Sequence, residues 1–431
     1  MKAFCESKKL PLDDCFGGHL KSCIDGDLNI VLYDRAKASD EGSAGAAVLK
    51  EIQRLNLQPE TRAWDLLSIA LSVIVADTYA HRDKSPDGWT RNINLNVAVS
   101  DPKFWNAQSD LLSNQLKFLT TDIWNFTFQK GKFQHAPNKP VNRPEQDCVA
   151  LLSGGLDSLI GAIDLVHGSG KNPYAVSQVS RGDKSTQADF ASKIGDGLAH
   201  LQLNHNASCP GSNERSQRAR SIIFLAYGVL IATALKSYQE DKNVDLFICE
   251  NGFISINPPL TDNRLGSLST RTTHPMFINR FQQILNEADL RVNIKNPYQF
   301  STKGEMLTNC VDQNFLCKHA HNSISCGRYA RNAYKHCGRC LPCLIRRSAF
   351  HMWKKKDQTQ YVYDCRSQNY ACYDDVRSTI MAITAAKVGD LTTWAGPSLS
   401  TALLGDIVQY RNVLERGLGE LEAFLRKKKV M

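Results

Sequence analysis

The chain has 431 residues, 42% of them hydrophobic, and a formal net charge of +9. It is too long for one ordinary domain, so we expect two or three, each with a full core. The moderate positive charge permits an anionic ligand or partner but does not demand nucleic acid. No stretch has the pattern of a signal peptide or a membrane span, and the longest apolar run, 222–235, is predicted to be a buried helix. We therefore expect a cytoplasmic protein, whose 14 cysteines are thiols or metal ligands rather than disulfides.

Residues 1–130 are expected to form a separate N-terminal α+β domain. Apolar and alternating runs predict strands, and an apolar stripe predicts one long helix; these elements are 28–33, 93–99, 124–128 and the helix 61–80. At the end of that helix Asp77 and Arg82 are expected to form a solvated pair. The segment has no catalytic constellation, so we assign it to recognition or assembly. Residues 131–146 contain three prolines and are predicted to be a linker.

The stretch 147–160 is predicted to be a buried strand that runs into an anion-binding turn, followed by a helix. The turn has the sequence Ser153, Gly154, Gly155, Leu156, Asp157, Ser158. Glycines let the backbone approach an anion closely, and the N–H groups at the start of the helix point at it. It is not a Walker loop, because the nearby Gly170-Lys171 pair is followed by Asn172. The alternative is a tight turn with no ligand.

This turn resembles the pyrophosphate loop of the ATP-pyrophosphatase (PP-loop) superfamily, whose members cleave ATP between the α- and β-phosphates and adenylate their substrates. The resemblance implies an α/β fold of the adenine nucleotide alpha hydrolase-like type, a parallel sheet with helices on both faces. It also implies ATP and Mg²⁺ as ligands, with residues 153–158 as the nucleotide-binding residues.

Two further parallel strands are predicted at 174–179 and 245–249, with a long helix at 213–238 between them. In open parallel sheets ligands lie beyond the carboxyl ends of the strands. We therefore expect Ser180 to border the nucleotide, with an ordinary polar loop as the alternative. Glu250 is expected either to help hold Mg²⁺ or to serve as a cap or surface residue.

Residues 256–275 are rich in turn formers and hydroxyls and predict a substrate loop. Its candidate substrate contacts are Arg271, Thr272 and His274. Arg271 is a candidate clamp for a carboxylate, and His274 is either a proton-transfer group or only a hydrogen-bond partner.

Lys303 is predicted to lie in the first turn of a helix that Ser301 or Thr302 caps. A lysine is a poor partner for the positive end of a helix, so an anion is expected nearby. We expect Asp157 and Lys303 to lie outside the core, so that substituting either affects turnover rather than folding.

Four cysteines with the spacing C-x10-C-x2-C-x2-C predict a structural zinc site: Cys326, Cys337, Cys340 and Cys343. The alternatives are a C-x-x-C redox pair and an iron–sulfur cluster. Nearby arginines make this a basic region, either a solvated face or one that meets an anionic ligand; they are Arg328, Arg331, Arg339, Arg346 and Arg347.

Together, the loop, the Phe300–Glu305 segment and the cysteine pattern resemble the 7-cyano-7-deazaguanine synthase (QueC-like) family over residues 147–350. In that family ATP activates a carboxylate on 7-deazaguanine, ammonia converts it to an amide, and a second activation gives the nitrile. The resemblance implies an ATP-dependent, C–N bond-forming ligase. It implies Asp157, Lys303 and Arg220 as catalytic residues.

Two features depart from the family: its Tyr-Pro-Asp segment is absent at residues 269–275, and the N-terminal domain is additional. Such enlarged chains resemble the QueC-like proteins of Qat-type antiviral defence operons, whose neighbours are an ATPase, a small partner protein and a TatD-like nuclease. Residues 351–431 are expected to form a helical tail. The alternatives to free-base adenylation are transfer of the activated base to a partner protein, tRNA modification, and a non-catalytic nucleotide-sensing subunit.

Overall fold

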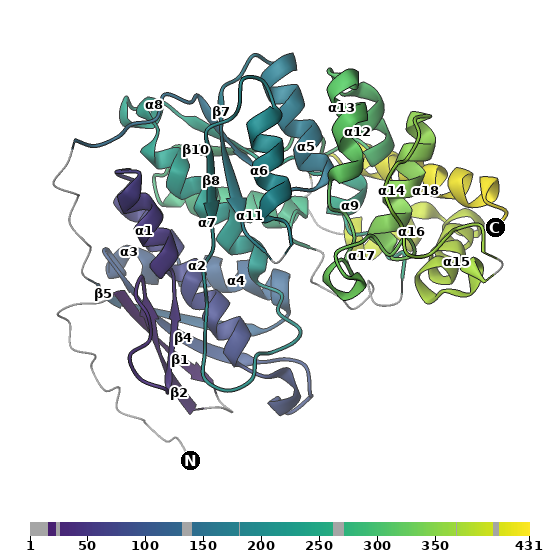
Figure 1. Ribbon diagram of the computed structural model, residues 1–431. Coiled ribbons are helices and arrows are strands. Elements are labelled where there is room, and N and C mark those ends of the chain that lie inside the picture. Colours follow the sequence, from purple (N-terminus) through teal and green to yellow (C-terminus); the bar gives the residue numbers. More distant parts are fainter. Residues whose placement is uncertain are drawn as a thin grey trace. The chain divides into compact units, whose positions relative to one another are not determined.

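The computed structural model describes residues 16–22, 26–131, 140–180, 182–261, 271–367, 369–399 and 405–431 (Figure 1). Two compact units make up the chain: Met1–Arg143, Leu203–Ala234 and Asn286–Leu290 form the first, and Pro144–Gln202, Leu235–Leu285 and Arg291–Met431 the second. The first unit thus takes in two segments from the middle of the chain. The expected boundaries 1–130, 131–146, 147–350 and 351–431 stay predictions, and residues 132–139 of the expected linker lie outside the described residues.

The first unit is built on a five-stranded mixed sheet with the order β3-β2-β1-β4-β5. Its strands are β1 (Phe16–Ser22), β2 (Gly26–Leu32), β3 (Glu41–Ala44), β4 (Asn92–Val99) and β5 (Ile123–Lys130). Strand β1 is antiparallel to both of its neighbours, whereas β2 pairs with β3 and β4 with β5 in parallel. The three strands expected here are confirmed to within two residues, and β1 and β3 were not predicted.

Helices α2 and α7 form the centre of the first unit. The helices of this unit are α1 (Ala46–Arg54), α2 (Thr61–Tyr79), α3 (Pro102–Ala107), α4 (Ser109–Thr120) and α7 (Arg220–Ala234). Both α2 and α7 are buried on nearly every side and pack against each other. A helix that is apolar on all sides must be packed against other elements on all sides. A chain without residues 1–130 would therefore expose α7, so the role of this unit must be tested with point variants.

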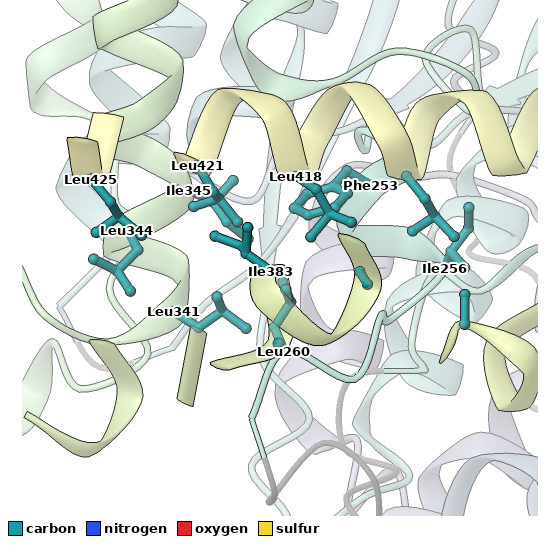
Figure 2. Packing of buried hydrophobic residues seen from close by; sticks show 14 of the residues in the cluster. Phe253, Ile256, Leu260, Leu341, Leu344, Ile345, Ile383, Leu418, Leu421 and Leu425 are labelled. Carbon is teal, nitrogen blue, oxygen red and sulfur yellow. The ribbon is translucent and has the colours of Figure 1, made fainter. Parts of the chain in front are cut away.

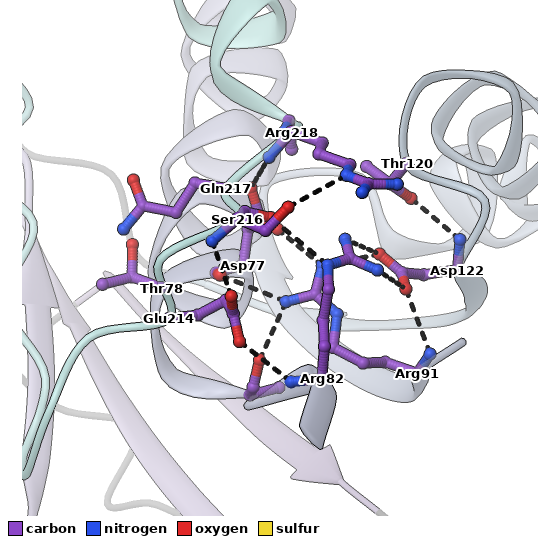
Figure 3. Close-up of polar contacts among 12 residues, drawn as sticks. Asp77, Thr78, Arg82, Arg91, Thr120, Asp122, Glu214, Ser216, Gln217 and Arg218 are labelled. Carbon is purple, nitrogen blue, oxygen red and sulfur yellow. Dashed lines mark hydrogen bonds and ion pairs between the residues drawn. The ribbon is translucent and has the colours of Figure 1, made fainter. Parts of the chain in front are cut away.

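A buried polar network in the first unit fixes the chain ahead of α7 (Figure 3). Arg91 donates to Asp77 at 2.6 Å and to Asp122 at 2.5 Å. Arg82 donates twice to Asp122, at 2.8 and 2.9 Å, so the expected solvated Asp77–Arg82 pair is wrong. The second carboxylate oxygen of Asp77 accepts from the backbone N–H of Arg218 at 2.7 Å. Because Asp77 binds the backbone there, α7 begins at residue 220 and not at 213 as predicted.

The second unit contains a parallel five-stranded sheet with the order β10-β9-β6-β7-β8. Its strands are β6 (Cys148–Leu151), β7 (Pro173–Gln178), β8 (His200–Leu203), β9 (Val244–Phe247) and β10 (Val292–Lys295). The chain winds from β6 outward to β8, then returns to the other side of β6 with β9 and β10. The topological switch point, where such sheets bind ligands, therefore lies between β6 and β9.

The helices of the second unit are α5 (Leu156–Ile163), α6 (Lys184–Lys193), α8 (Lys236–Gln239), α9 (Gly252–Ser255), α11 (Pro275–Glu287), α12 (Lys303–Asn309), α13 (Gln313–His319), α14 (Leu341–Trp353), α15 (Asp374–Val388), α16 (Leu391–Trp394), α17 (Gly396–Leu399) and α18 (Ile407–Lys427). One core joins α5 and α6 to α12, α13 and α14. A second core packs α9, α14 and α15 against α18 (Figure 2). The C-terminal helices α15 and α18 are thus part of a core of the second unit.

Among the described residues, no helix is long and apolar enough to cross a lipid bilayer. The 11 described cysteines are all free, in agreement with the expectation that thiols or metal ligands prevail.

Candidate functional site

The predicted anion-binding turn lies between the end of β6 and the start of α5. Gly154 has φ +81°, and a Cβ there would lie 3.3 Å from Cγ of Gln187, so the turn requires glycine. The hydroxyl oxygens of Ser153 and Ser158 lie 3.1 Å apart, and the N–H of Gly155 donates to Ser153 Oγ at 3.2 Å. Hydroxyl donors, a glycine turn and the first-turn N–H groups of a helix are a donor set that fits a phosphate group.

Ser180 follows the end of β7, the strand next to β6. The side chain of Gln187 donates to the carbonyl oxygens of Ser153 (3.4 Å) and Gln178 (3.1 Å), so it ties the ends of these two strands together. Ser180 is exposed, and its N–H donates to Asp183 Oδ1 at 2.8 Å. It therefore lies at the sheet edge that carries the turn. The side chain of Leu156, by contrast, is in the core, so only its backbone can face a ligand.

Asp157 and Lys303 form a buried ion pair at the switch point. Each is 5% exposed, so the expectation that they lie outside the core is wrong. Asn251, which follows β9, donates its side-chain N–H to the other oxygen of Asp157 at 2.6 Å. Burial alone would raise the pKa of Asp157, but the charge of Lys303 and these hydrogen bonds hold it below its usual value. The anion expected near Lys303 is thus Asp157 itself.

Glu250 gives the cluster a second carboxyl group, directly after β9. Burial and the neighbouring Asp157 raise its pKa well above the usual value. The side-chain oxygens of these two residues are ligands that Mg²⁺ prefers. The role of Glu250 as a Mg²⁺ ligand stays a prediction, because Lys303 and Asn251 already contact both carboxylate oxygens of Asp157.

Thr302 caps α12 and places Lys303 in its first turn, as predicted. The cap is reciprocal: Thr302 Oγ1 accepts from the N–H of Glu305 at 3.1 Å, and Glu305 Oε2 accepts from the N–H of Thr302 at 2.9 Å. Glu420 of α18 accepts from the hydroxyl of Thr302 and from the N–H of Gly304 at 3.3 Å. No local sequence pattern indicates this contact, because Glu420 is 118 residues away from Thr302.

The candidate substrate residues lie just before α11. Nδ1 of His274 accepts from the N–H of Met276 at 3.2 Å, so Nε2 carries the proton and donates to the carbonyl of Ser398 at 3.3 Å. Burial lowers the pKa of His274 to about 4. Both ring nitrogens are occupied, which favours the hydrogen-bonding role for His274 over proton transfer. Arg271 and Thr272 are half-buried, and residues 262–270 of the expected substrate loop lie outside the described residues.

Arg220 belongs to the first unit, whereas Asp157 and Lys303 belong to the second. It is the first residue of α7 and donates to Oε1 of Gln217 at 3.1 and 2.7 Å. Its catalytic role stays a prediction.

The four predicted metal ligands come together in the second unit. Their sulfur atoms all lie within 4.8 Å of one another, and all four residues are buried. The sulfurs of Cys326 and Cys340 are 3.8 Å apart and those of Cys337 and Cys343 are 4.0 Å apart. Four thiolates at the usual zinc–sulfur distance would be separated by about 3.8 Å, so the donor set and its spacing fit tetrahedral zinc.

Hydrogen bonds within the cluster lower the pKa of Cys326 and Cys337 but raise that of Cys340 and Cys343. The N–H of Cys337 donates to Cys326 Sγ and the N–H of Cys340 to Cys337 Sγ, both at 3.3 Å. The hydrogen bond with Cys337 raises the pKa of Cys326, but those with Cys340 and Cys343 outweigh it, and this pKa falls to about 7. Thiolates are the form that binds zinc.

The segment just before Cys326 contacts the phosphate turn. The N–H of Ile324, two residues before Cys326, donates to the carbonyl of Gly154 at 2.9 Å. Arg346 fixes this segment by donating to Ser323 Oγ at 2.7 Å. Arg346 and Arg347 are buried, so these two arginines do not belong to a solvated basic face.

Tyr334 is a candidate site residue that sequence reasoning missed. It is 41% exposed, and a Cβ on Gly182 would lie 2.5 Å from its ring, so the ring covers the loop that follows Ser180. Ala333 and Tyr334 both have positive φ, 48° and 58°, which is uncommon for residues with side chains. No short motif signals such a conformation.

Comparison with family models gives a match to Queuosine biosynthesis protein QueC over residues 272–354. No curated protein and no solved structure matches the chain. The matched stretch contains Lys303 and all four cysteines, and it begins after the phosphate turn. This part of the second unit is therefore similar to QueC, which supports a QueC-like, ATP-using enzyme.

Proposed function

We propose that the second unit is an adenylating enzyme that splits ATP into AMP and pyrophosphate and acts on a carboxylated, deazapurine-type base. The observation that carries the proposal is the Ser153–Ser158 turn at the switch point of a parallel sheet, with the buried Asp157–Lys303 pair beside it. The similarity to QueC over residues 272–354 supports the substrate class.

In the proposed reaction a carboxylate oxygen of the substrate attacks the α-phosphorus of ATP, and the bond to the bridging oxygen breaks so that pyrophosphate leaves. The N–H groups at the start of α5 and the hydroxyls of Ser153 and Ser158 donate to phosphate oxygens. Asp157 and Glu250 would hold Mg²⁺, which would neutralise phosphate charge. Such a transfer needs positioning and electrostatic stabilisation more than covalent help from the protein. A nucleophile, which is ammonia in the QueC family, then attacks the acyl carbon, and AMP leaves.

The test is product analysis with α-labelled ATP and carboxylated deazapurines. We expect AMP and pyrophosphate in equal amounts, formed only when the carboxylated base is present. Ser158→Ala should lower the rate by about tenfold or more, because it removes a phosphate donor. Ser192→Ala, in the exposed part of α6, is the matched control and should not change the rate. ADP and phosphate as the main products would refute the proposal.

We further propose that the protein acts in antiviral defence in the cytoplasm. Its first unit would recognise a protein partner, and this partner would accept the activated base. The occupied ring nitrogens of His274 and the absent Tyr-Pro-Asp segment favour an acceptor that differs from the family's free base. Mass spectrometry of small molecules and of co-purified proteins after turnover distinguishes an amide or nitrile from a protein conjugate. A free nitrile formed in the absence of any other protein would refute transfer to a partner.

A further inference from the structure

A cavity of about 340 Å³ lies in the second unit between α14, the segment that follows it, and the end of α18. This volume is within the range of small-molecule sites. None of the residues of the phosphate turn or the Asp157 cluster lines it. The adenylation chemistry proposed above makes no use of this cavity.

Two lysine triplets, Lys354–Lys356 and Lys427–Lys429, each contribute one residue to the wall of the cavity. Lys355 and Lys428 line it directly. Burial, and after it the charges of Lys428 and Lys427, lower the pKa of His351 in the cavity wall, so the second triplet acts on this wall. Among the described residues, none of the six lysines is in an ion pair; the acid at the end of α18, Glu422, pairs with Lys387 and Arg426 instead.

Helix dipoles do not account for this concentration of charge. A lysine in the last turn of a helix interacts favourably with the negative end of the dipole. However, α14 ends at Trp353 and α18 at Lys427, so five of the six lysines lie beyond the helix ends. Five of the six are exposed, and Lys428 is half-buried. The rim is therefore a surface suited to several negative charges.

The interior of the cavity has a different character. Its walls include the aromatic rings of Phe350, Tyr361 and Phe424, and the guanidinium of Arg347 lies 3.8 Å from the centre of the Tyr361 ring. The acid Asp357 also lines the cavity and accepts from the hydroxyl of Tyr361 at 2.7 Å. Asp357 can accept from the amino groups of a ligand, and the guanidinium of Arg347 can donate to its carbonyl oxygens. The interior thus fits a flat, uncharged ring that carries both N–H donors and carbonyl acceptors.

We propose that this cavity takes up one base of a single-stranded nucleic acid, whose phosphates lie on the two lysine triplets. Bases stack on aromatic side chains while lysines follow the backbone in proteins that bind single strands. An acidic peptide would need no aromatic walls and would be repelled by Asp357. A free mononucleotide would not use six lysines.

The test is fluorescence anisotropy with labelled 12-nucleotide RNA and DNA of mixed sequence, at 50–200 mM salt. We expect dissociation constants of roughly 1–100 µM near physiological salt. An oligonucleotide of equal length whose sugars carry no bases should bind at least about fivefold more weakly, because base stacking contributes about 1–3 kcal/mol per base. The RNA and DNA measurements identify which strand is preferred.

The decisive variant replaces Lys355, Lys356 and Lys428 with glutamine. It should bind at least about tenfold more weakly, and the slope of log K against log salt should decrease by about 2, since each phosphate contact in a single strand contributes about 0.7. The matched control replaces Lys50, Lys103 and Lys117, which are exposed and change the net charge equally. It should bind like the unmodified protein.

Four results would overturn the proposal: no oligonucleotide binding, equal losses in the two triple variants, equal affinity for the base-free strand, or polyglutamate that competes as well as RNA. Neither triple variant should alter AMP formation, so failure here is distinguishable from failure of the proposed adenylation.

Discussion

Replacing Lys303 with methionine tests whether its ion pair with Asp157 stabilises the switch point. Both side chains are 5% exposed, so the substitution leaves a carboxylate buried without its cation. Removing one partner of a buried pair costs about 3–5 kcal/mol of unfolding free energy. We expect a loss near the lower end of that range, because Asn251 still donates to Asp157 at 2.6 Å.

Because a chain of two units need not unfold in one step, hydrogen exchange with mass spectrometry is the suitable assay. A loss of about 3 kcal/mol corresponds to a roughly 100-fold loss of protection in peptides from α5 and α12. Lys193→Met is the control, because Lys193 pairs with Asp189 at 2.6 Å in the same unit but is exposed. It should change protection by less than about fivefold, as expected for a surface pair.

The double variant Asp157→Asn/Lys303→Met separates the ion pair from simple loss of side-chain volume. With both charges removed no ion is left buried, so we expect it to be at least about 2 kcal/mol more stable than the sum of the two single losses predicts. Additive losses would refute the account of a buried, mutually dependent pair. Unchanged protection in Lys303→Met would refute it as well.

Three further predictions follow from the described contacts. Cys340→Ser should lower zinc content and melting temperature, whereas Cys372→Ser, an exposed free thiol, should change neither. Gly154→Ala should lower the free energy of unfolding by about 1–2 kcal/mol and weaken ATP binding, because alanine disfavours φ +81° and its Cβ would contact Gln187 closely. An unchanged ATP affinity in calorimetry would contradict this prediction. Burial raises the pKa of Glu420 to about 7 in the folded state, from an ordinary value of 4.5. The folded state therefore holds this proton more tightly, so its contribution to stability is full below pH 4.5 and is lost as pH rises to 7. Glu420→Gln should remove this pH dependence, which amounts to about 3 kcal/mol of unfolding free energy. In denaturant titrations the variant should therefore gain stability relative to the unmodified protein as pH rises from 4.5 to 7. A difference in stability that stays constant over this pH range would contradict the prediction.

The sequence was most informative where local geometry alone determines the structure. The glycine turn of residues 153–158, the cap at Thr302 and the cysteine spacing each depend on neighbours within a few residues, and each is found as predicted. The positions of most predicted strands are also confirmed, because apolar runs of that length fit a buried sheet.

Burial of charge was the main feature that the sequence did not reveal. Asp77, Arg91 and Asp122 look like surface residues in any short window, yet each is 2% exposed or less. Their charges compensate one another only after α2, β4 and β5 have come together. The same holds for Asp157 and Lys303, which are 146 residues apart in the chain. Local pattern cannot predict such pairs, because the partner that makes burial tolerable is distant.

The C-terminal helix contacts the two segments that provide the partners of Asp157. On one side, Glu420 accepts from Thr302 and Gly304, and Arg416 donates to Glu305 at 2.6 Å, so α18 holds the start of α12, where Lys303 lies. A Cβ on Gly304 would collide with Glu420, which shows how closely the helix approaches.

On its other side, α18 packs against α9, the short helix that Asn251 caps. A Cβ on Gly417 would lie 2.3 Å from the ring of Phe253, so glycine permits this contact as well. Lys303 and Asn251 both bind Asp157, and both are held by elements that rest on α18. The helix expected to be a tail therefore positions the charge and the hydrogen bond that keep Asp157 ionised beside the phosphate turn.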